Sequence, residues 1–146
     1  MAEQHRGIPV VLRTADFRRM LAREVQRATR YQDFLSLFLV RLACPPERRA
    51  IIRDLVARKL VDLLRSSDVV GMVEEDLAVI LVHTSDTDAL AITERLQPVL
   101  RDFILSEPTG GEVTVQLSLV AFPGDATSDD ALLARALARL PSRRNS

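Results

Sequence analysis

The sequence predicts an α+β domain built on a split βαβ (βαββαβ) sheet with helices packed on it. Helix-type and strand-type apolar patterns alternate along the chain, and two strand-type runs follow each other across one short acidic turn. The 146 residues are 47% hydrophobic and 27% charged, and 20 basic residues balance 20 acidic ones. This composition is typical of one globular domain, and the neutral net charge gives no electrostatic reason to expect a nucleic-acid or membrane partner.

The first half of the chain predicts a helix, a strand and a second helix. Thr14 suits an N-cap, and the apolar residues of 14–30 recur at helical spacing. The apolar run 34–43 predicts a buried strand, and the prolines at 45 and 46 end it and start a helix over 47–67. The expected buried residues of these two helices are Phe17, Leu21, Val25, Ala28, Ile52, Leu55, Leu60 and Leu63.

The second half predicts a hairpin, a helix, a strand and a closing helix. Strands over 68–73 and 77–82 flank an acidic turn, and Thr84 or Ser85 can cap the helix that follows. That helix continues through Pro98 with a kink, and its expected buried residues are Ala89, Ile92, Leu96, Val99 and Phe103. An alternating run over 113–123 predicts the last long strand, and Ser128 suits the N-cap of the final helix. Without the flanking helices, the order is βαββαβ, with the two internal helices on one face of the sheet.

The chemistry-bearing residues outside the hairpin predict little. Cys44 is the only cysteine, so the chain forms no internal disulfide, and we expect a small buried hydrophobe rather than a nucleophile. His5 and His83 have no partner at metal-ligand spacing, so we expect no metal and no other cofactor. No segment has the apolar length of a signal peptide or a membrane span. These features favour the reducing cytoplasm.

Three stretches resemble GGDEF domains, the diguanylate cyclases. "RYQDFLSLFLVRL" is similar to the entry to their first strand, "LRSSDVVGMVEEDLAVILVHT" to the region of their signature hairpin, and "VTVQLSLVAFPGDATSDDALLARA" to their final strand and helix. The resemblance runs from about Phe17 to Leu140. It implies a nucleotide-cyclase-like, GGDEF-like sheet and three segments: an N-terminal arm over 1–13, a degenerate GGDEF-like domain over 14–140 and a disordered tail over 141–146.

The signature itself is degenerate. In the family, two glycines let the backbone approach the GTP phosphates, and the acids that follow serve metal binding and catalysis. The aligned residues are Val73, Glu74, Glu75, Asp76 and Leu77, and the interval before them is one residue short. The acids are kept, but a Cβ at either glycine position obstructs the close approach to phosphate.

The rest of the family's machinery is also replaced. Its first strand ends in Asp-x-Asp, whose leading carboxylate holds Mg²⁺, whereas this chain has Arg41 and Ala43. The guanine-recognising loop and helix are replaced by "CPPERRAII", and Ser-Ile-Gly of the last strand has become "QLS" at 116–118. We therefore expect no cyclase activity. We also expect Arg41 to pair with Glu74 or Glu75 across adjacent strands, the alternative being that these charges are all solvated.

One feature of the family is retained. GGDEF domains often carry Arg-x-x-Asp upstream of the signature as an inhibitory site for cyclic di-GMP, and Arg65 and Asp68 stand nearly in register. An Arg fork can bind phosphate or a guanine edge while Asp accepts from the guanine donors. The alternative is that the two residues only cap the preceding helix. The second Arg that usually precedes the signature is absent, because Gly71 or Met72 occupies its place.

Three functions stay open on the sequence. The first is an inactive, pseudoenzyme module that acts as a scaffold through a protein partner in bacterial signalling or cell polarity. The second is a cyclic di-GMP receptor that uses Arg65 and Asp68. The third is a residual metal-dependent nucleotide enzyme that uses Glu74, Glu75 and Asp76. The sequence does not decide whether the chain forms a homodimer.

Overall fold

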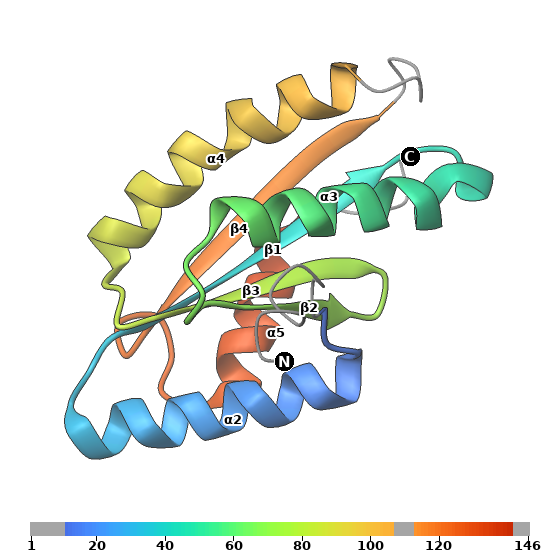
Figure 1. The fold of residues 1–146 in the computed structure, drawn as a ribbon. Helices are drawn as coiled ribbons and strands as arrows, with labels where there is room; N and C mark the ends of the chain where they lie inside the picture. Colours follow the sequence, from blue (N-terminus) through green and yellow to red (C-terminus); the bar gives the residue numbers. More distant parts are fainter. Residues whose placement is uncertain (1–10, 107–112, 142–146) are drawn as a thin grey trace, which may run out of the picture.

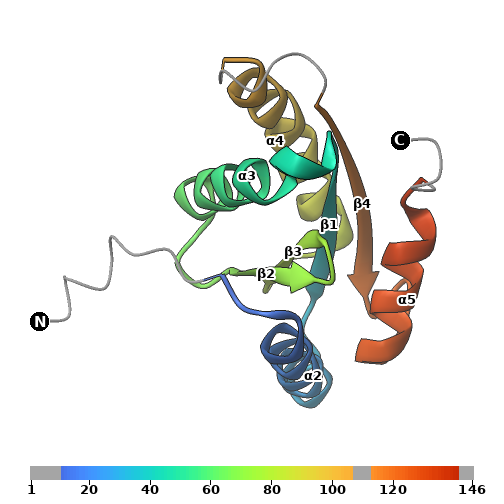
Figure 2. The same ribbon diagram turned by 90° about the vertical axis from the view of Figure 1, so that its right-hand side faces the viewer.

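The computed structural model describes residues 11–106 and 113–141 as a four-stranded antiparallel sheet covered by helices on both faces (Figures 1 and 2). The strand order is β2-β3-β1-β4, as in a split βαβ fold. In chain order the elements are α2 (Thr14–Tyr31), β1 (Leu35–Ala43), the 3₁₀ turn η1 (Pro46–Arg48), α3 (Arg49–Leu63), β2 (Val69–Val73), β3 (Asp76–Val82), α4 (Asp86–Ser106), β4 (Thr114–Phe122) and α5 (Asp129–Arg139). The predicted fold class is confirmed.

The sheet buries a core on each of its faces. One face of β1, lined by Leu35, Leu37 and Leu39, packs with residues of α2 and α5, and the opposite face packs with α3 and α4. Figure 2 shows these two helical layers with the sheet between them. The internal helices share one face, as predicted, and the flanking helices cover the other. Because both faces are covered, β1 and β3 are almost continuously apolar rather than alternating.

Several predicted details are corrected. Thr14 is the first residue of α2 and Arg13 is its N-cap, whereas Ser128 does cap α5, because its Oγ accepts from the Ala131 N–H at 3.1 Å. Leu63 and Val99 are exposed. The residues that α3 and α4 bury are Ile52, Val56, Ala57, Leu60, Ala89, Thr93, Leu96, Leu100 and Ile104. In α4 the buried stripe therefore runs through positions 89, 93, 96, 100 and 104, and this helix lies along β4 (Figure 1).

The N-terminal arm contributes to the sheet where it is described. Leu12 forms a parallel bridge to Gly71 on the outer edge of β2. A Cβ at Gly71 would lie 2.5 Å from Phe17 Cδ1 and 3.0 Å from the Leu12 carbonyl oxygen, so only glycine fits at this position. Most of the predicted arm and the predicted disordered tail lie outside the described residues.

Candidate functional site

The hairpin at the position that the resemblance aligns with the family signature has a two-residue turn. Val73 and Asp76 are paired in register, so Glu74 and Glu75 alone form the turn and both are exposed. Glu74 has φ 57°, in the left-handed region that favours glycine. Its N–H donates to Thr14 Oγ1 at 3.0 Å. The turn is therefore held against the start of α2, and its backbone carries a side chain where the resemblance places a glycine.

Arg41 pairs with Asp76 rather than with either turn residue. Arg41 Nε donates to Asp76 Oδ1 at 3.0 Å, and Nη2 donates to Oδ2 at 2.8 Å. The prediction of Glu74 or Glu75 as the partner is wrong, and so is the alternative that all the charges of this group, Arg41 among them, are solvated. The reason is register: Val40 faces Leu77, which places Arg41 opposite Asp76 on the same face of the sheet.

The ion pair is largely shielded from solvent. The side chain of Arg41 is 12% exposed and that of Asp76 is 2% exposed. The hydrogen bond to Asp76 raises the pKa of Arg41 above its ordinary value, although burial acts in the opposite direction. Bidentate pairing fixes the geometry of both groups, so the guanidinium holds a positive charge where the resemblance places a metal-binding carboxylate.

Neighbouring contacts complete this end of the sheet. Arg41 Nη1 donates to the Pro141 carbonyl oxygen at 2.6 Å, which ties the segment just after α5 to Arg41. Arg49, at the start of α3, donates to Glu75 Oε1 at 3.2 Å. Each of the acids Glu75 and Asp76 therefore faces an arginine of this chain.

Two further positions that the resemblance singles out lie near this ion pair. Ala43, which the resemblance aligns with the second Asp of Asp-x-Asp, carries no ligand atom in its side chain, and Gln116, in the replaced Ser-Ile-Gly stretch, lies opposite Arg41 on β4. Ser118 Oγ donates to the Ala136 carbonyl oxygen at 2.8 Å and so serves the packing of α5. Within residues 11–106 and 113–141, no group of three or more His, Cys, Asp or Glu side chains is placed to hold a metal ion.

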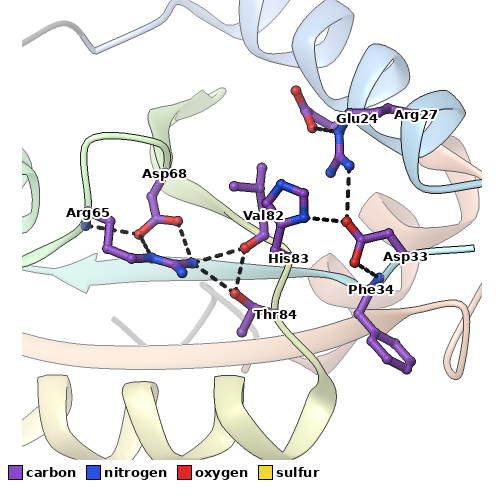
Figure 3. A network of polar contacts seen from close by, with 9 residues as sticks. All are labelled: Glu24, Arg27, Asp33, Phe34, Arg65, Asp68, Val82, His83 and Thr84. Carbon is purple, nitrogen blue, oxygen red and sulfur yellow. Dashed lines mark hydrogen bonds and ion pairs between the residues drawn. The ribbon is translucent and has the colours of Figure 1, made fainter. Parts of the chain in front are cut away.

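At the opposite end of the sheet, Arg65 and Asp68 bind each other (Figure 3). Asp68 Oδ2 accepts from the Arg65 N–H at 3.0 Å and from Nε at 3.3 Å, and Oδ1 accepts from Nη2 at 3.0 Å. The same Nη2 donates to the Val82 carbonyl oxygen and to Thr84 Oγ1, each at 2.9 Å. The pair thus ties the end of α3 to the segment that follows β3.

The two side chains differ in their access to solvent. The Asp68 side chain is 2% exposed and that of Arg65 is 53% exposed. A hollow of about 180 Å³ lies beside them, lined by Val61, Leu64, Arg65, Ser66, Asp68 and Val70. Pockets for drug-sized ligands measure about 300–1,000 Å³. Arg65 is accessible to an anion, whereas the Asp68 carboxylate is occupied by hydrogen bonds within the chain.

A second polar cluster at this end was missed by the sequence analysis. Asp33 Oδ2 accepts from Arg27 Nη1 at 3.0 Å and also pairs with His83 Nδ1. Burial raises the pKa of Asp33, but hydrogen bonds from Arg27, the Phe34 N–H and His83 outweigh it, so the net pKa lies below its ordinary value. Figure 3 shows that this cluster adjoins the Arg65–Asp68 pair through Val82, His83 and Thr84. The sequence predicts only that His83 has no partner at metal-ligand spacing, and its pairing with Asp33 has no signal in the sequence.

Solved structures with this architecture identify the fold. A DGC protein from Thermotoga maritima has a TM-score of 0.78 at 19% identity, covering 92% of this chain and 99% of its own. The fold is that of a GGDEF domain. The GGDEF domain of DgcB from Caulobacter crescentus, in complex with c-di-GMP, has a TM-score of 0.65 at 15% identity, covering 88% of this chain and 80% of its own.

A third GGDEF-fold structure contains a protein partner. The diguanylate cyclase SiaD from Pseudomonas aeruginosa, in complex with its activator SiaC, has a TM-score of 0.57 at 19% identity, covering 88% of this chain and 56% of its own. No protein-family model matches the sequence, and no curated protein matches it significantly. No helix in the described part of the chain is long and apolar enough to cross a membrane. Cys44 is half-buried against the core shared with α3 and α4.

Proposed function

We propose that this chain is a catalytically inactive GGDEF-like domain that acts as a protein-interaction or scaffold module in bacterial signalling or cell polarity. The observation that supports inactivity is the Arg41–Asp76 ion pair. A GGDEF cyclase needs Mg²⁺ near the end of β1, where this chain places a guanidinium instead. The positive charge repels the metal and also occupies the carboxylate of Asp76.

The signature turn supports the same conclusion. Phosphate cradling requires a backbone that a ligand can approach closely, and the turn here carries two glutamate side chains. The N–H of Glu74, at the position of the second glycine, already donates to Thr14. Two exposed carboxylates at this point also repel a triphosphate.

A protein partner is supported by an apolar surface near the start of β1. A pocket of about 360 Å³ is lined by Ala28, Thr29, Gln32, Asp33, Phe34, Phe122, Pro123 and Thr127. Phe34, which lines the pocket, is exposed, and so is Tyr31, which precedes the lining residue Gln32 in the sequence. Exposed aromatic groups around a hollow are typical of protein-binding surfaces. A module without catalysis transmits a signal only by such contacts.

The proposal is tested by assaying the purified chain with GTP and Mg²⁺ for formation of cyclic di-GMP. We expect no product at enzyme concentrations where an active GGDEF domain converts its substrate completely. Turnover that is lost in Asp76→Asn would instead establish the residual metal-dependent enzyme. For the interaction role, Phe34→Asp is expected to abolish capture of the partner, and Phe34→Tyr is the control that keeps the aromatic ring.

A cyclic di-GMP receptor is the second candidate, favoured by the half-exposed Arg65 and by the neighbour solved with c-di-GMP. It is disfavoured by the burial of Asp68. Calorimetric titration with cyclic di-GMP decides between the receptor and the protein-interaction module. Micromolar binding that Arg65→Ala abolishes supports a receptor. Absence of binding by the unmodified chain leaves the interaction module as the function.

A further inference from the structure

The outer edge of β4 is covered over only part of its length. The Ala121 N–H donates to Asp125 Oδ2, and the Ala121 carbonyl oxygen accepts from the Asp125 N–H, each at 2.8 Å. The Leu119 carbonyl oxygen accepts from Arg139 Nη1 at 2.6 Å. These contacts protect the second half of the strand. The first half has no such cover among the described residues.

The uncovered backbone groups belong to Val115 and Leu117. Along a strand, the N–H and carbonyl groups of alternate residues point to the same side. Those of Ala121 point away from β1, so those of Val115 and Leu117 do as well. No described residue hydrogen-bonds to them. Such a row of free donors and acceptors is a template for an added strand.

The side chains beside this edge differ between the two faces of the sheet. Val115 and Leu117 pack partly buried against the core shared with α3 and α4. Gln116 lies between them in the sequence, and its side chain is therefore on the other face. In an added strand, the residues opposite Val115 and Leu117 would place their side chains on the side of α4.

A groove flanks the open edge on that side. It has a volume of about 370 Å³, and α4 contributes Arg101, Ile104 and Leu105 to its lining, opposite residues 113–116. The Leu105 side chain is 60% exposed. Arg101 is also exposed and forms no ion pair with a described residue. The groove therefore offers an apolar and a cationic contact beside the free backbone groups.

Arg101 and Leu105 lie on the flank of α4 that faces away from α3. They are four residues apart, so they share one side of the helix. Phe103 is on the opposite flank, where Nζ of Lys59, from α3, lies 5.3 Å from the centre of its ring. α3 packs on β1 and β2, whereas α4 packs mainly on β4. The flank with Arg101 and Leu105 therefore adjoins the outer edge of the sheet.

The spacing of these two side chains matches that of alternate residues in a strand. Four residues of a helix advance about 6 Å, and two residues of a strand advance about 6.8 Å. α4 and β4 follow each other in the chain and run in opposite directions (Figure 1). Leu105 is therefore nearer to Val115, and Arg101 is nearer to Leu117.

We propose that this edge binds an extended segment of a partner protein, added antiparallel to β4, in which an acidic residue stands two positions before an aliphatic one. The acidic residue lies opposite Leu117 and pairs with Arg101. The aliphatic residue lies opposite Val115 and contacts Leu105. Each of the two exchanges a pair of backbone hydrogen bonds with β4.

The charge of the groove favours an acidic segment. Among the described residues that line it, Arg101 alone is charged. A guanidinium binds a carboxylate through two parallel hydrogen bonds and repels a basic side chain. Backbone pairing is independent of sequence, so selectivity for the segment depends on these two side-chain contacts. This inference goes beyond the proposed function, because it depends neither on the loss of catalysis nor on the pocket at Phe34.

The test is a fluorescence anisotropy titration of the full chain against a labelled synthetic peptide, Ser-Thr-Asp-Thr-Val-Thr-Ser. We expect a dissociation constant of about 10–100 μM. The same peptide with an N-methylated valine lacks the N–H that donates to the Val115 carbonyl oxygen, and it should bind at least about tenfold more weakly. Equal binding of the two peptides, or no binding at about 1 mM, overturns the proposal.

A charge exchange tests the contact with α4. Arg101→Glu should weaken binding at least about tenfold, and a peptide with Lys in place of Asp should recover it in this variant. Arg95→Glu is the matched control, because Arg95 is an exposed arginine on another side of the same helix. An equal effect of the two substitutions, or no recovery with the Lys peptide, contradicts the pairing with Arg101. Circular dichroism confirms that each variant is folded.

Hydrogen exchange measured by NMR distinguishes other occupants of the edge. In the free chain, the amides of Val115 and Leu117 should exchange rapidly, and the peptide should slow both. Slow exchange in the dilute free chain means that the chain covers its own edge. Exchange that slows only as the protein concentration rises means that a second copy covers it. Either result overturns the proposal without bearing on the tests of cyclase activity and of the pocket at Phe34.

Discussion

The two ends of the sheet are both closed by an arginine–carboxylate pair, but the pairs differ in burial and in what they connect. At the hairpin end, Arg41 and Asp76 come from adjacent strands; the side chain of Asp76 is buried and that of Arg41 is largely shielded from solvent. At the opposite end, Arg65 is half-exposed while Asp68 is buried, and the pair links a helix end to the loop after β3. The first pair therefore satisfies both of its charges within the sheet, at the position proposed to have lost a metal site, whereas the second leaves one cationic group accessible.

This difference has an energetic consequence. A buried charge whose partner is removed keeps its full desolvation cost, whereas a charge that can turn toward water loses little. Asp76 has no such freedom, because its side chain is enclosed. Arg65 can hydrate when Asp68 is removed, so most of the cost there comes from the backbone donor that Asp68 satisfies.

The largest effect is expected from Arg41→Met, which leaves Asp76 buried without its guanidinium. Loss of one partner of a buried pair costs about 3–5 kcal/mol in the free energy of unfolding. Arg49→Met is the matched control, because its partner Glu75 is exposed, and we expect a cost of at most about 1 kcal/mol. Urea denaturation measures both values. If the two variants lose the same stability, the pair is not shielded as the structure indicates.

The double variant Arg41→Met with Asp76→Leu sharpens this result. Removal of both charges eliminates the unpaired carboxylate, so most of the lost stability should return. Coupling between the two positions is read from the double-mutant cycle. A double variant that is as unstable as the sum of the single variants would contradict a direct interaction.

At the opposite end, Asp68→Ala is expected to lower the free energy of unfolding by about 2 kcal/mol. The Arg65 N–H and the Arg65 guanidinium both lose their acceptor, and the backbone donor is the more costly of the two to leave unsatisfied. Ser66→Ala, at an exposed neighbouring position, serves as the control. If Asp68→Ala lowers the free energy of unfolding as much as Arg41→Met does, the two ion pairs do not differ in their contribution to stability.

Glu74→Gly should have a smaller effect of the opposite sign. A non-glycine residue in the left-handed region costs roughly 1–2 kcal/mol, and part of the gain is offset by the greater freedom of glycine in the unfolded chain. We therefore expect stabilisation of about 0.5–1 kcal/mol by this restoration of a family glycine. Glu75→Gly, the adjacent turn residue without a positive φ, should not stabilise the chain. Thermal denaturation distinguishes the two variants.

Acid titration gives the smallest expected effect and concerns the Asp33 cluster. The folded pKa of Asp33 lies below its unfolded value of about 4, so its contribution to stability is present above pH 4 and is lost as the pH falls toward the folded pKa. Asp33→Asn should flatten the loss of stability in this acidic range. Unfolding measured from pH 6 down to pH 3 in both chains tests the sign. A steeper loss in the variant would contradict it.

The fold was predictable because long apolar runs and helical spacing record burial on both faces of the sheet. The partner of Arg41 was not, because it depends on the length of the turn: Asp76 belongs to β3 and only Glu74 and Glu75 form the turn. The exposure of Val99 depends on how α4 is rotated over β4, which periodicity within the helix does not fix. The Asp33–Arg27–His83 cluster joins α2, the connection before β1 and the residue after β3, and no local sequence pattern predicts a contact between these segments.

The most direct test of the proposal that Arg41 replaces a metal ion is calorimetric titration of the chain with GTP and Mg²⁺, in parallel with Arg41→Asp. The unmodified chain should show no Mg²⁺-dependent binding of GTP. Arg41→Asp places a carboxylate beside Asp76, so this variant should bind a divalent cation if it remains folded by circular dichroism. Mg²⁺-dependent binding of GTP by the unmodified chain that Asp76→Asn abolishes would show that the site is open and that Arg41 does not replace the metal.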